Sequence, residues 1–225
     1  MLENAWVVVP AYRESAVLRS VVAELRTRCS HIVVVDDGSK DGTAGEALAG
    51  GAVVLTHAVN LGQGAALRTG IDFALLGGAR YIFTFDADGQ HDPDSLAVLA
   101  ETMRKTGASV VLGSRWLGRA ESMPPARRTM LKLAVVFTRL HSGLRLTDTH
   151  NGLRLFTREA ASRIRITQAR MAHASEILNE ISTCRLRYTE APVTLRYTEY
   201  SLRKGQRISG MFRVLADIVY ARWTQ

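Results

Sequence analysis

Two aspartates separated by one residue, Asp86 and Asp88, are the side chains in this sequence best suited to bind a metal ion. They follow the apolar run Tyr81–Phe85, so the segment should be extended, and residues two apart on an extended segment point to the same side. Paired carboxylates suit a hard cation such as Mg²⁺ or Mn²⁺, whose other positions are filled by water and phosphate oxygens. Because Asp and Gly also form turns, a plain turn is the alternative.

Polar residues also follow the earlier apolar runs. Asp36 and Asp37 end the second run and suit hydrogen bonds to a ribose or a base, although a capped turn is the alternative. Gly62 and Gly64 follow the third run and form half of a dinucleotide-binding glycine fingerprint, whose third glycine position holds Leu67. A dinucleotide dehydrogenase is therefore not predicted, and the two glycines allow either a close backbone approach to a ligand or a tight turn.

The elements that must position these residues alternate between β-branched runs and helical periods, which predicts an α/β fold with a mostly parallel, twisted sheet flanked by helices. Ligands bind at the carboxyl ends of such strands, so the acidic clusters should converge on one edge, where a cation or hydrogen-bond donors must offset their repulsion. A basic, proline-containing loop is expected over Arg115–Arg128. The expected strands are Trp6–Val9, Ile32–Val35, Val53–Thr56, Tyr81–Phe85, Val110–Leu112, Leu153–Phe156 and Pro192–Tyr197, and the expected helices are Glu14–Arg28, Thr43–Ala49, Gly64–Leu76, Pro93–Lys105, Thr129–Leu140, His173–Thr183 and an amphipathic C-terminal helix, Ile208–Trp223.

Composition narrows the class of protein. With 225 residues, 47% of them hydrophobic and 22% charged, the chain can bury a real core, which excludes disorder as its main state. A net charge of +8 predicts an acidic partner, either a nucleic acid, an anionic membrane or a phosphorylated substrate. Two distant cysteines, Cys29 and Cys184, favour a reduced, cytoplasmic compartment. No signal peptide is recognisable, and the longest nearly apolar stretch, Met130–Leu140, is too short to span a bilayer.

Five segments stand in order along the first half of the chain: VVVPAYRE, VVVDDGSKDGT, NLGQGAALRTG, FDADGQHDPD and GSR. Together they resemble the family 2 glycosyltransferases with the GT-A fold, most closely their dolichol-phosphate-mannose-synthase-like, polyprenyl-phosphate branch. The similarity covers about Trp6 to Arg115 and resumes at Asp148–Arg154 and Arg203–Arg207. It implies one GT-A domain over residues 1–225, with a nucleotide-sugar-binding half (1–115) and an acceptor-side half (116–225).

The resemblance also implies a donor site. Pro10, Tyr12 and Glu14 would border the nucleotide base, and Asp36 would hold the base or the ribose. Asp37, Gly62 and Gly64 are further substrate-binding candidates on the arguments above. Asp86, Asp88 and Gln90 would bind the Mg²⁺ or Mn²⁺ that bridges the diphosphate of a nucleotide-diphosphate sugar.

Cations are expected against the phosphates. Arg115 and the basic loop with Arg203, Lys204 and Arg207 match places where this branch sets cations against phosphates, and a solvated charge run is the alternative for the loop. Breaking the bond to the anomeric carbon leaves negative charge on the diphosphate, which a metal and positioned cations stabilise. Asp88 is therefore expected to contribute to catalysis through the metal.

The acceptor decides whether a general base is needed. The resemblance implies inversion by direct attack of the acceptor on the anomeric carbon. A hydroxyl acceptor needs a base, for which Asp148 and Glu176 are the candidates, whereas an ionised phosphate needs none. The branch usually has Ser-Gly where this chain has His150-Asn151, which leaves the acceptor open. His173 is better explained as a histidine on a partly buried helix face.

The expected function is transfer of a sugar to a polyprenyl-linked or glycan acceptor in cell-surface polysaccharide synthesis, on the cytoplasmic side of a membrane. The segment Pro124–Leu140 and the C-terminal helix would lie on an anionic membrane surface, or else cover the sheet or form a homodimer contact. Related enzymes often carry C-terminal membrane spans, so a chain ending at Gln225 is expected to be peripheral or a fragment.

Two other functions are disfavoured. A sugar-nucleotide pyrophosphorylase would have a glycine-rich phosphate loop after its first strand, where this chain has PAYRE. A nucleic-acid-binding protein is suggested by the sequence pI near 10.0, yet the polar strand ends are acidic, so no nucleic acid partner is expected.

Overall fold

The apolar runs of the sequence assemble into one seven-stranded sheet in the order β3-β2-β1-β4-β6-β5-β7. Six strands run in the same direction, and β6 is antiparallel to both of its neighbours, β4 and β5. The mostly parallel sheet predicted from the sequence is therefore confirmed. The strands are β1 (Ala5–Ala11), β2 (His31–Asp36), β3 (Val53–Thr56), β4 (Tyr81–Thr84), β5 (Val110–Glu121), β6 (Arg154–Thr157) and β7 (Tyr188–Arg196).

The structure is a computed structural model, and it describes only part of the chain. The expected basic loop Arg203–Arg207 and the expected helix Ile208–Trp223 lie outside the described residues, as does most of the expected helix Thr129–Leu140. None of the described helices is long and apolar enough to cross a membrane. The described residues are 2–124, 128–129, 131–132, 135, 143–149, 151–169, 172–197 and 200.

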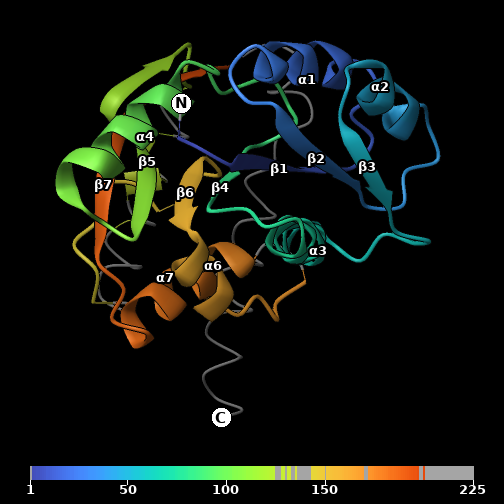
Figure 1. Cartoon of the computed structure of the whole chain (residues 1–225). Coiled ribbons are helices and arrows are strands. Elements are labelled where there is room, and N and C mark those ends of the chain that lie inside the picture. Colours follow the sequence, from blue (N-terminus) through green and yellow to red (C-terminus); the bar gives the residue numbers. More distant parts are fainter. Residues whose placement is uncertain are drawn as a thin grey trace, which may run out of the picture.

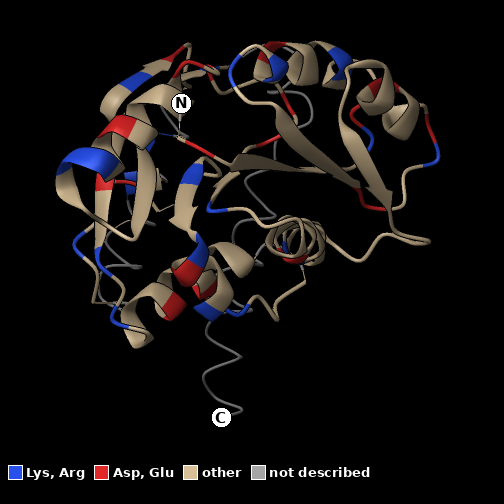
Figure 2. Cartoon of the chain, in the orientation of Figure 1, with Lys and Arg blue, Asp and Glu red and all other residues tan. Residues whose placement is uncertain are grey.

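Helices cover both faces of the sheet (Figure 1). Alternate residues of β1 enter different cores, since Val7 and Val9 pack with α1, α2 and α4 whereas Val8 packs with α3, α6 and α7. Figure 2 shows that the ribbons of β1, β2 and β3 are almost free of charged residues, as expected for strands buried on both sides. The helices are α1 (Leu18–Arg26), α2 (Thr43–Ala49), α3 (Gln63–Leu76), α4 (Ser95–Thr106), α6 (Arg158–Arg163) and α7 (His173–Thr183).

The expected loop over Arg115–Arg128 is wrong in its first half, because β5 continues to Glu121. A register shift between Ser114 and Arg119 lets the strand resume its pairing with β7. Gly118 permits the close approach of the two strands, since a Cβ there would lie 2.2 Å from the backbone oxygen of Val193. Of the charged residues that suggested a loop, Arg119 and Glu121 are exposed on this strand, whereas Arg115 is buried.

Some helix boundaries differ from expectation by a few residues, and one helix was not expected. The first helix begins at Leu18 and not at Glu14, whose backbone oxygen accepts hydrogen bonds from the N–H groups of Val17 and Leu18. The short helix α6 was not predicted; the Thr157 hydroxyl caps it by accepting a hydrogen bond from the backbone N–H of Ala160 at 3.2 Å. In contrast, α2, α7 and β3 have the bounds that the sequence predicted.

Helix α3 lies close against β1 and β2, which generates a test of the fold. A Cβ on Gly70 would lie 2.4 Å from Val8 Cγ1, whereas a Cβ on the exposed Gly45 of α2 would meet nothing within 4 Å. We expect Gly70→Ala to lower the free energy of unfolding by about 1–3 kcal/mol through overpacking. The matched Gly45→Ala should raise it by about 0.5–1 kcal/mol, because alanine loses less backbone entropy. Urea unfolding checks both; equal effects would contradict this packing.

Candidate active site

Adjacent strands bring the acidic clusters of the sequence to one edge. Strand β1 lies between β2 and β4, with Ala11 paired to Asp36 and Val8 paired to Thr84. The segments that follow these strands therefore start side by side, and Asp86 comes two residues after Thr84. The predicted convergence of polar strand ends is what the sheet order produces.

Asp86 is held by contacts within the protein. Its Oδ1 accepts a hydrogen bond from Gln63 Nε2 at 3.2 Å, and its Oδ2 lies 3.4 Å from His91 Nε2. Burial alone would raise the pKa of Asp86, but the hydrogen bond from His91 and the charges of His91 and Arg154 keep it below its usual value. Gly152 is required beside it, since a Cβ there would lie 2.1 Å from Oδ2. The side chain is still 29% exposed, so a ligand can reach it.

Asp88 lies in the opposite electrostatic situation. Burial, followed by the charges of Asp86 and Glu14, raises its pKa to about 6, although its Oδ1 accepts a hydrogen bond from the Gln90 N–H at 3.0 Å. A carboxylate disfavoured by neighbouring negative charge is stabilised when a cation binds. The partly exposed Asp88 therefore gains more than Asp86 from a nearby cation, and metal binding by either residue stays a prediction.

The residues present fit a metal that arrives with its substrate. Within the described ranges, no group of three or more His, Cys, Asp or Glu side chains is arranged to hold a metal ion. Mg²⁺ commonly binds through one or two carboxylates and completes its shell with substrate phosphates and water. Asp88 with Asp86 would supply such a partial shell. Gln90 is buried and its backbone positions Asp88, so ligation by its side chain stays a prediction.

His91 was not singled out from the sequence, and the structure places it against Asp86, with its Nε2 3.4 Å from Asp86 Oδ2. It is buried, its backbone bridges to Leu195 of β7, and its ring lies 5.5 Å from that of Phe85. Its Nδ1 has no hydrogen-bond partner in the described part of the chain. The only signal in the sequence was its place at the end of the Asp86–His91 polar run.

The residues expected to border the nucleotide lie at or just after the ends of β1 and β2, and Tyr200, far along the chain, contacts one of them. Pro10, Glu14 and Asp36 are buried and Tyr12 is exposed. Glu14 Oε2 accepts a hydrogen bond from the Tyr200 hydroxyl at 2.8 Å. Burial, and then the contact with Glu14, raises the pKa of Tyr200. The residues expected beside the base therefore do lie together, and their contact with a base stays a prediction.

Asp37 contacts the chain itself. Its carboxylate accepts hydrogen bonds from the N–H groups of Leu61 at 2.9 Å and Gly62 at 2.7 Å, and His57 Nδ1 lies 2.7 Å away. Gly62 has a positive φ of 105°, which favours glycine. These contacts position the loop that leads into α3, and a substrate contact of Asp37 or Gly62 stays a prediction.

Gly64 allows the backbone of residues 168–169 to approach it closely, whereas the sequence suggested a close approach to a ligand or a tight turn. A Cβ there would lie 2.1 Å from the backbone oxygen of Gln168, and the Gly64 N–H donates to the backbone oxygen of Ala169 at 2.8 Å. The segment near residue 168 is itself held by Glu176, whose carboxylate accepts hydrogen bonds from the N–H groups of Thr167 and Gln168. These contacts give Glu176 a structural role, and general base action by it stays a prediction.

Arg115 and Asp148 form a buried ion pair. Arg115 Nε donates to Asp148 Oδ2 at 2.6 Å, its backbone N–H donates to the same oxygen at 3.1 Å, and its Nη1 donates to the Tyr197 hydroxyl at 2.8 Å. Burial would lower the pKa of Arg115, but the negative charge of Asp148 raises it overall. Glu190 fixes the turn by accepting the Asp148 N–H at 3.0 Å. The expected roles of Arg115 against phosphate and of Asp148 as base stay predictions.

The unusual His150-Asn151 pair is described only at Asn151. This residue is buried and its Oδ1 accepts a hydrogen bond from the Leu153 N–H at 3.0 Å, while its Nδ2 has no partner among the described residues. The nearby histidine of α7, His173, is buried and contributes positive charge toward Asp86. His173 was expected on a partly buried helix face. It is instead buried and close enough for its charge to act on Asp86.

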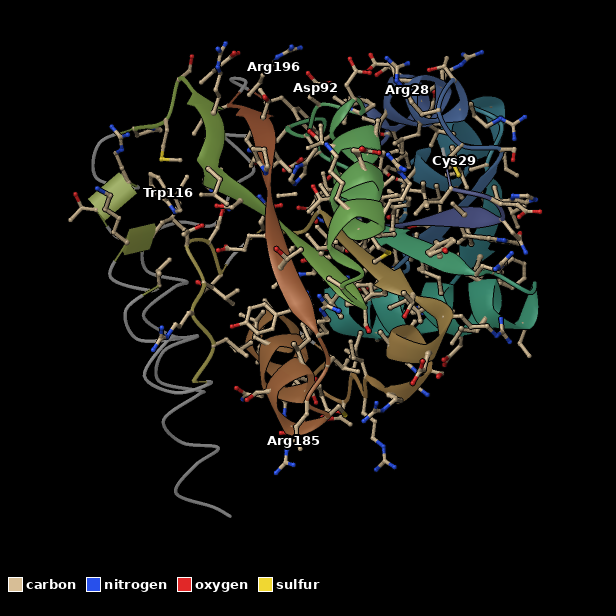
Figure 3. The ribbon with its side chains drawn as sticks, turned by 60° about the vertical axis from the view of Figure 1, so that its left-hand side comes forward. Arg28, Cys29, Asp92, Trp116, Arg185 and Arg196 are labelled. Carbon is tan, nitrogen blue, oxygen red and sulfur yellow. The ribbon has the colours of Figure 1, made fainter. Side chains whose placement is uncertain are left out.

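A cation–aromatic cluster lies on the acceptor-side half of the chain. The Trp116 ring of β5 has the guanidinium carbon of Arg128 5.7 Å and the Nζ of Lys132 5.8 Å from its centroid; Figure 3 labels Trp116. Cations beside an indole ring are attracted by its electron-rich face. Two positive charges therefore lie beside Trp116, in the part of β5 where its register with β7 shifts.

Comparison with known proteins gives consistent matches. The family model described as glycosyl transferase family 2 matches residues 6–165. A UDP-N-acetylglucosamine–dolichyl-phosphate N-acetylglucosaminyltransferase of Methanococcus voltae is 30% identical over 93% of this chain and 92% of its own length. A polyprenol monophosphomannose synthase of Mycolicibacterium smegmatis is 33% identical over 72% of this chain and 64% of its own length.

A solved structure shares the fold. Glucosyl-3-phosphoglycerate synthase of Mycobacterium tuberculosis, crystallised with Mn²⁺, UDP-glucose and phosphoglyceric acid, superposes with a TM-score of 0.70 at 18% identity, covering 96% of this chain and 77% of its own. The sheet order, the polar strand ends and these matches agree with the motifs of the sequence. The chain belongs to glycosyl transferase family 2 and is a glycosyltransferase.

Proposed function

We propose that this glycosyltransferase uses Mg²⁺ or Mn²⁺ to transfer a sugar, with inversion, from a nucleotide-diphosphate sugar to a polyprenyl phosphate. The observation that carries the proposal is the pair Asp86 and Asp88, two partly exposed carboxylates at the carboxyl edge of the sheet whose surroundings shift their pKa values in opposite directions. Three relatives are named for dolichyl-phosphate, polyprenol-phosphate or undecaprenyl-phosphate substrates or products. These names support a polyprenyl phosphate as the acceptor.

The carboxylates at this edge have different roles in the proposed reaction. Asp86, fixed by Gln63 and His91, offers a constant negative charge, and Asp88 is the ligand that gains most from a cation. The metal, when bound, neutralises charge on the departing diphosphate. Asp36 and Glu14 form the wall at the nucleotide end of the same edge.

A phosphate acceptor fits the state of Asp148. The Asp148 carboxylate is buried and its Oδ2 accepts two hydrogen bonds from Arg115, so these contacts are those of a residue that positions an arginine. A polyprenyl phosphate is already ionised and needs no base. Asp148 then acts by holding Arg115 and the bend of β5 in place, and Glu176 by holding the 167–168 segment.

The enzyme is proposed to work at the cytoplasmic face of a membrane, because a polyprenyl phosphate stays in the bilayer. The net charge of +8 and the cations at Trp116 favour an anionic lipid surface. A homodimer and a role in cell-surface polysaccharide synthesis remain part of the proposal.

Removing the metal ligand tests the reaction. Asp88→Asn should lower kcat/KM by roughly 100-fold or more, because the charge that develops on the leaving diphosphate is no longer neutralised. The matched control is Asp94→Asn, which removes one negative charge from a carboxylate that is 73% exposed and paired with Arg28. Steady-state kinetics with a nucleotide sugar and Mn²⁺ provides the measurement, with thermal unfolding to confirm the fold. Full activity of Asp88→Asn in a chelator would refute metal use through Asp88.

The pKa of Asp88 predicts how metal binding depends on pH. Because a proton and a cation compete for the carboxylate, Mn²⁺ affinity should be highest above pH 6 and should fall as the pH drops through about 6. Mn²⁺ titration by isothermal calorimetry between pH 5 and 8 measures this. Asp88→Asn should show a flatter dependence, and identical profiles for the two proteins would remove Asp88 from the metal site.

The buried Arg115–Asp148 pair predicts that a change at Asp148 lowers stability but leaves the pH dependence of kcat unchanged. Asp148→Asn leaves Arg115 buried beside a neutral side chain and should lower the free energy of unfolding by about 3–5 kcal/mol. The residual activity should keep the pH profile of the wild type, since Asp148 takes no proton. Urea unfolding and kcat against pH are the measurements; loss of a basic-limb ionisation with unchanged stability would instead identify Asp148 as the base.

A further inference from the structure

Arg154 is a buried arginine whose charge is not matched by a contacting acid. It is the first residue of β6, paired with Thr84 of β4 and Leu112 of β5, and it is only 4% exposed. Its Nε donates to the backbone oxygen of Asn151 at 3.2 Å. In the described part of the chain its guanidinium forms no ion pair. A buried guanidinium in this state costs free energy, so its presence here calls for an explanation.

The two acids whose charges act on Arg154, Asp86 and Asp148, already have other partners. Asp86 is contacted by Gln63 and His91, and Asp148 is contacted by Arg115. Both carboxylates favour the charge of Arg154 from a longer distance, but burial outweighs them and lowers its pKa to about 10. The protein therefore leaves part of the charge of Arg154 for another anion to balance.

The place of Arg154 in the sheet indicates which anion. Strands β2, β1 and β4 lead to the nucleotide end and to Asp88, and β6 is the next strand beyond β4. Strand β5, on the far side of β6, carries the Arg115–Asp148 pair. A group that reaches Arg154 thus lies between the metal-binding carboxylates and the acceptor-side half, where the two substrates must meet. A guanidinium matches the geometry of phosphate oxygens better than any other side chain.

We propose that Arg154 binds the phosphate group of the acceptor. The assignment rests on the proposed function, since the phosphate is that of the polyprenyl phosphate. In this role Arg154 holds the nucleophilic phosphate beside Asp86 while offsetting the repulsion between that phosphate and the two aspartates. The cost of burying an incompletely matched charge in the free protein is recovered when the acceptor phosphate enters.

Two variants and a control test the assignment. Arg154→Met removes the charge at similar volume, Arg154→Lys keeps it without the forked donors, and Arg145→Met removes an exposed arginine from the same half of the chain. Farnesyl phosphate serves as the soluble acceptor. Calorimetry measures its binding to the enzyme loaded with Mn²⁺ and nucleoside diphosphate, and a separate titration measures binding of the nucleoside diphosphate with Mn²⁺ alone.

For Arg154→Met we expect farnesyl phosphate to bind about 10- to 100-fold more weakly, as for the loss of charge-assisted hydrogen bonds. Binding of nucleoside diphosphate should stay within about twofold of wild type, because that ligand uses the Asp88 side of the site. Arg154→Lys should recover part of the loss. The thermal midpoint of Arg154→Met should be unchanged or higher, since an incompletely matched buried charge is removed.

Other results overturn the assignment. A lower thermal midpoint of Arg154→Met with unchanged farnesyl phosphate binding would make Arg154 a structural partner of Asp86 and Asp148. Loss of nucleoside diphosphate binding as large as in Asp88→Asn would place it on the donor. If wild type binds farnesyl phosphate through Arg154 yet transfers no sugar to it, the proposed function fails and the phosphate site stands.

Discussion

Repulsion between carboxylates at the edge of a parallel sheet is the constraint on which this site depends. Parallel strands bring Glu14, Asp86 and Asp88 to one edge because each follows the carboxyl end of its strand. The protein resolves the conflict unevenly. His91 and Gln63 satisfy one carboxylate, which stays readily ionised, and the other keeps a raised pKa. On the proposed function, that asymmetry leaves a position where a divalent cation would lower the repulsion between the carboxylates.

Much of this edge could be predicted because its signals are local. Buried parallel strands appear as short β-branched runs, and the residues after each run are read directly, so Asp36, Asp86 and Asp88 were identified as a converging set. The roles of His91 and Arg154 were not predicted, because their places in the Asp86–His91 run and the Asp148–Arg154 segment do not indicate what they contact. Their roles arise from pairing with strands far along the chain, Leu195 for His91 and Leu112 for Arg154.

The acceptor-side half was harder to predict for the same reason. The stretch after Ser114 is basic and contains Pro124 and Pro125, which indicates a loop when only neighbours in sequence are considered. In the structure the first part of this stretch continues β5 and pairs with β7. Only glycine fits at position 118, because the Val193 backbone lies against it. The partner of Arg115 is likewise 33 residues away, at Asp148. Long-range pairing, and not local propensity, determines which of these charges is buried.

Arg115 and Arg154 show how two buried arginines on neighbouring strands come to differ. Arg115 has a carboxylate at 2.6 Å and a tyrosine hydroxyl at 2.8 Å, so its charge is matched whether or not a substrate is present. Among the residues that the structure describes, the Arg154 side chain donates only to the backbone oxygen of Asn151, and the charge of Asp148 acts on it from a longer distance. A pair that is already matched gains less from a ligand, because its charge is balanced before the ligand binds. An unmatched one gains the full interaction, so the more costly arginine in the free protein is the one better suited to bind phosphate.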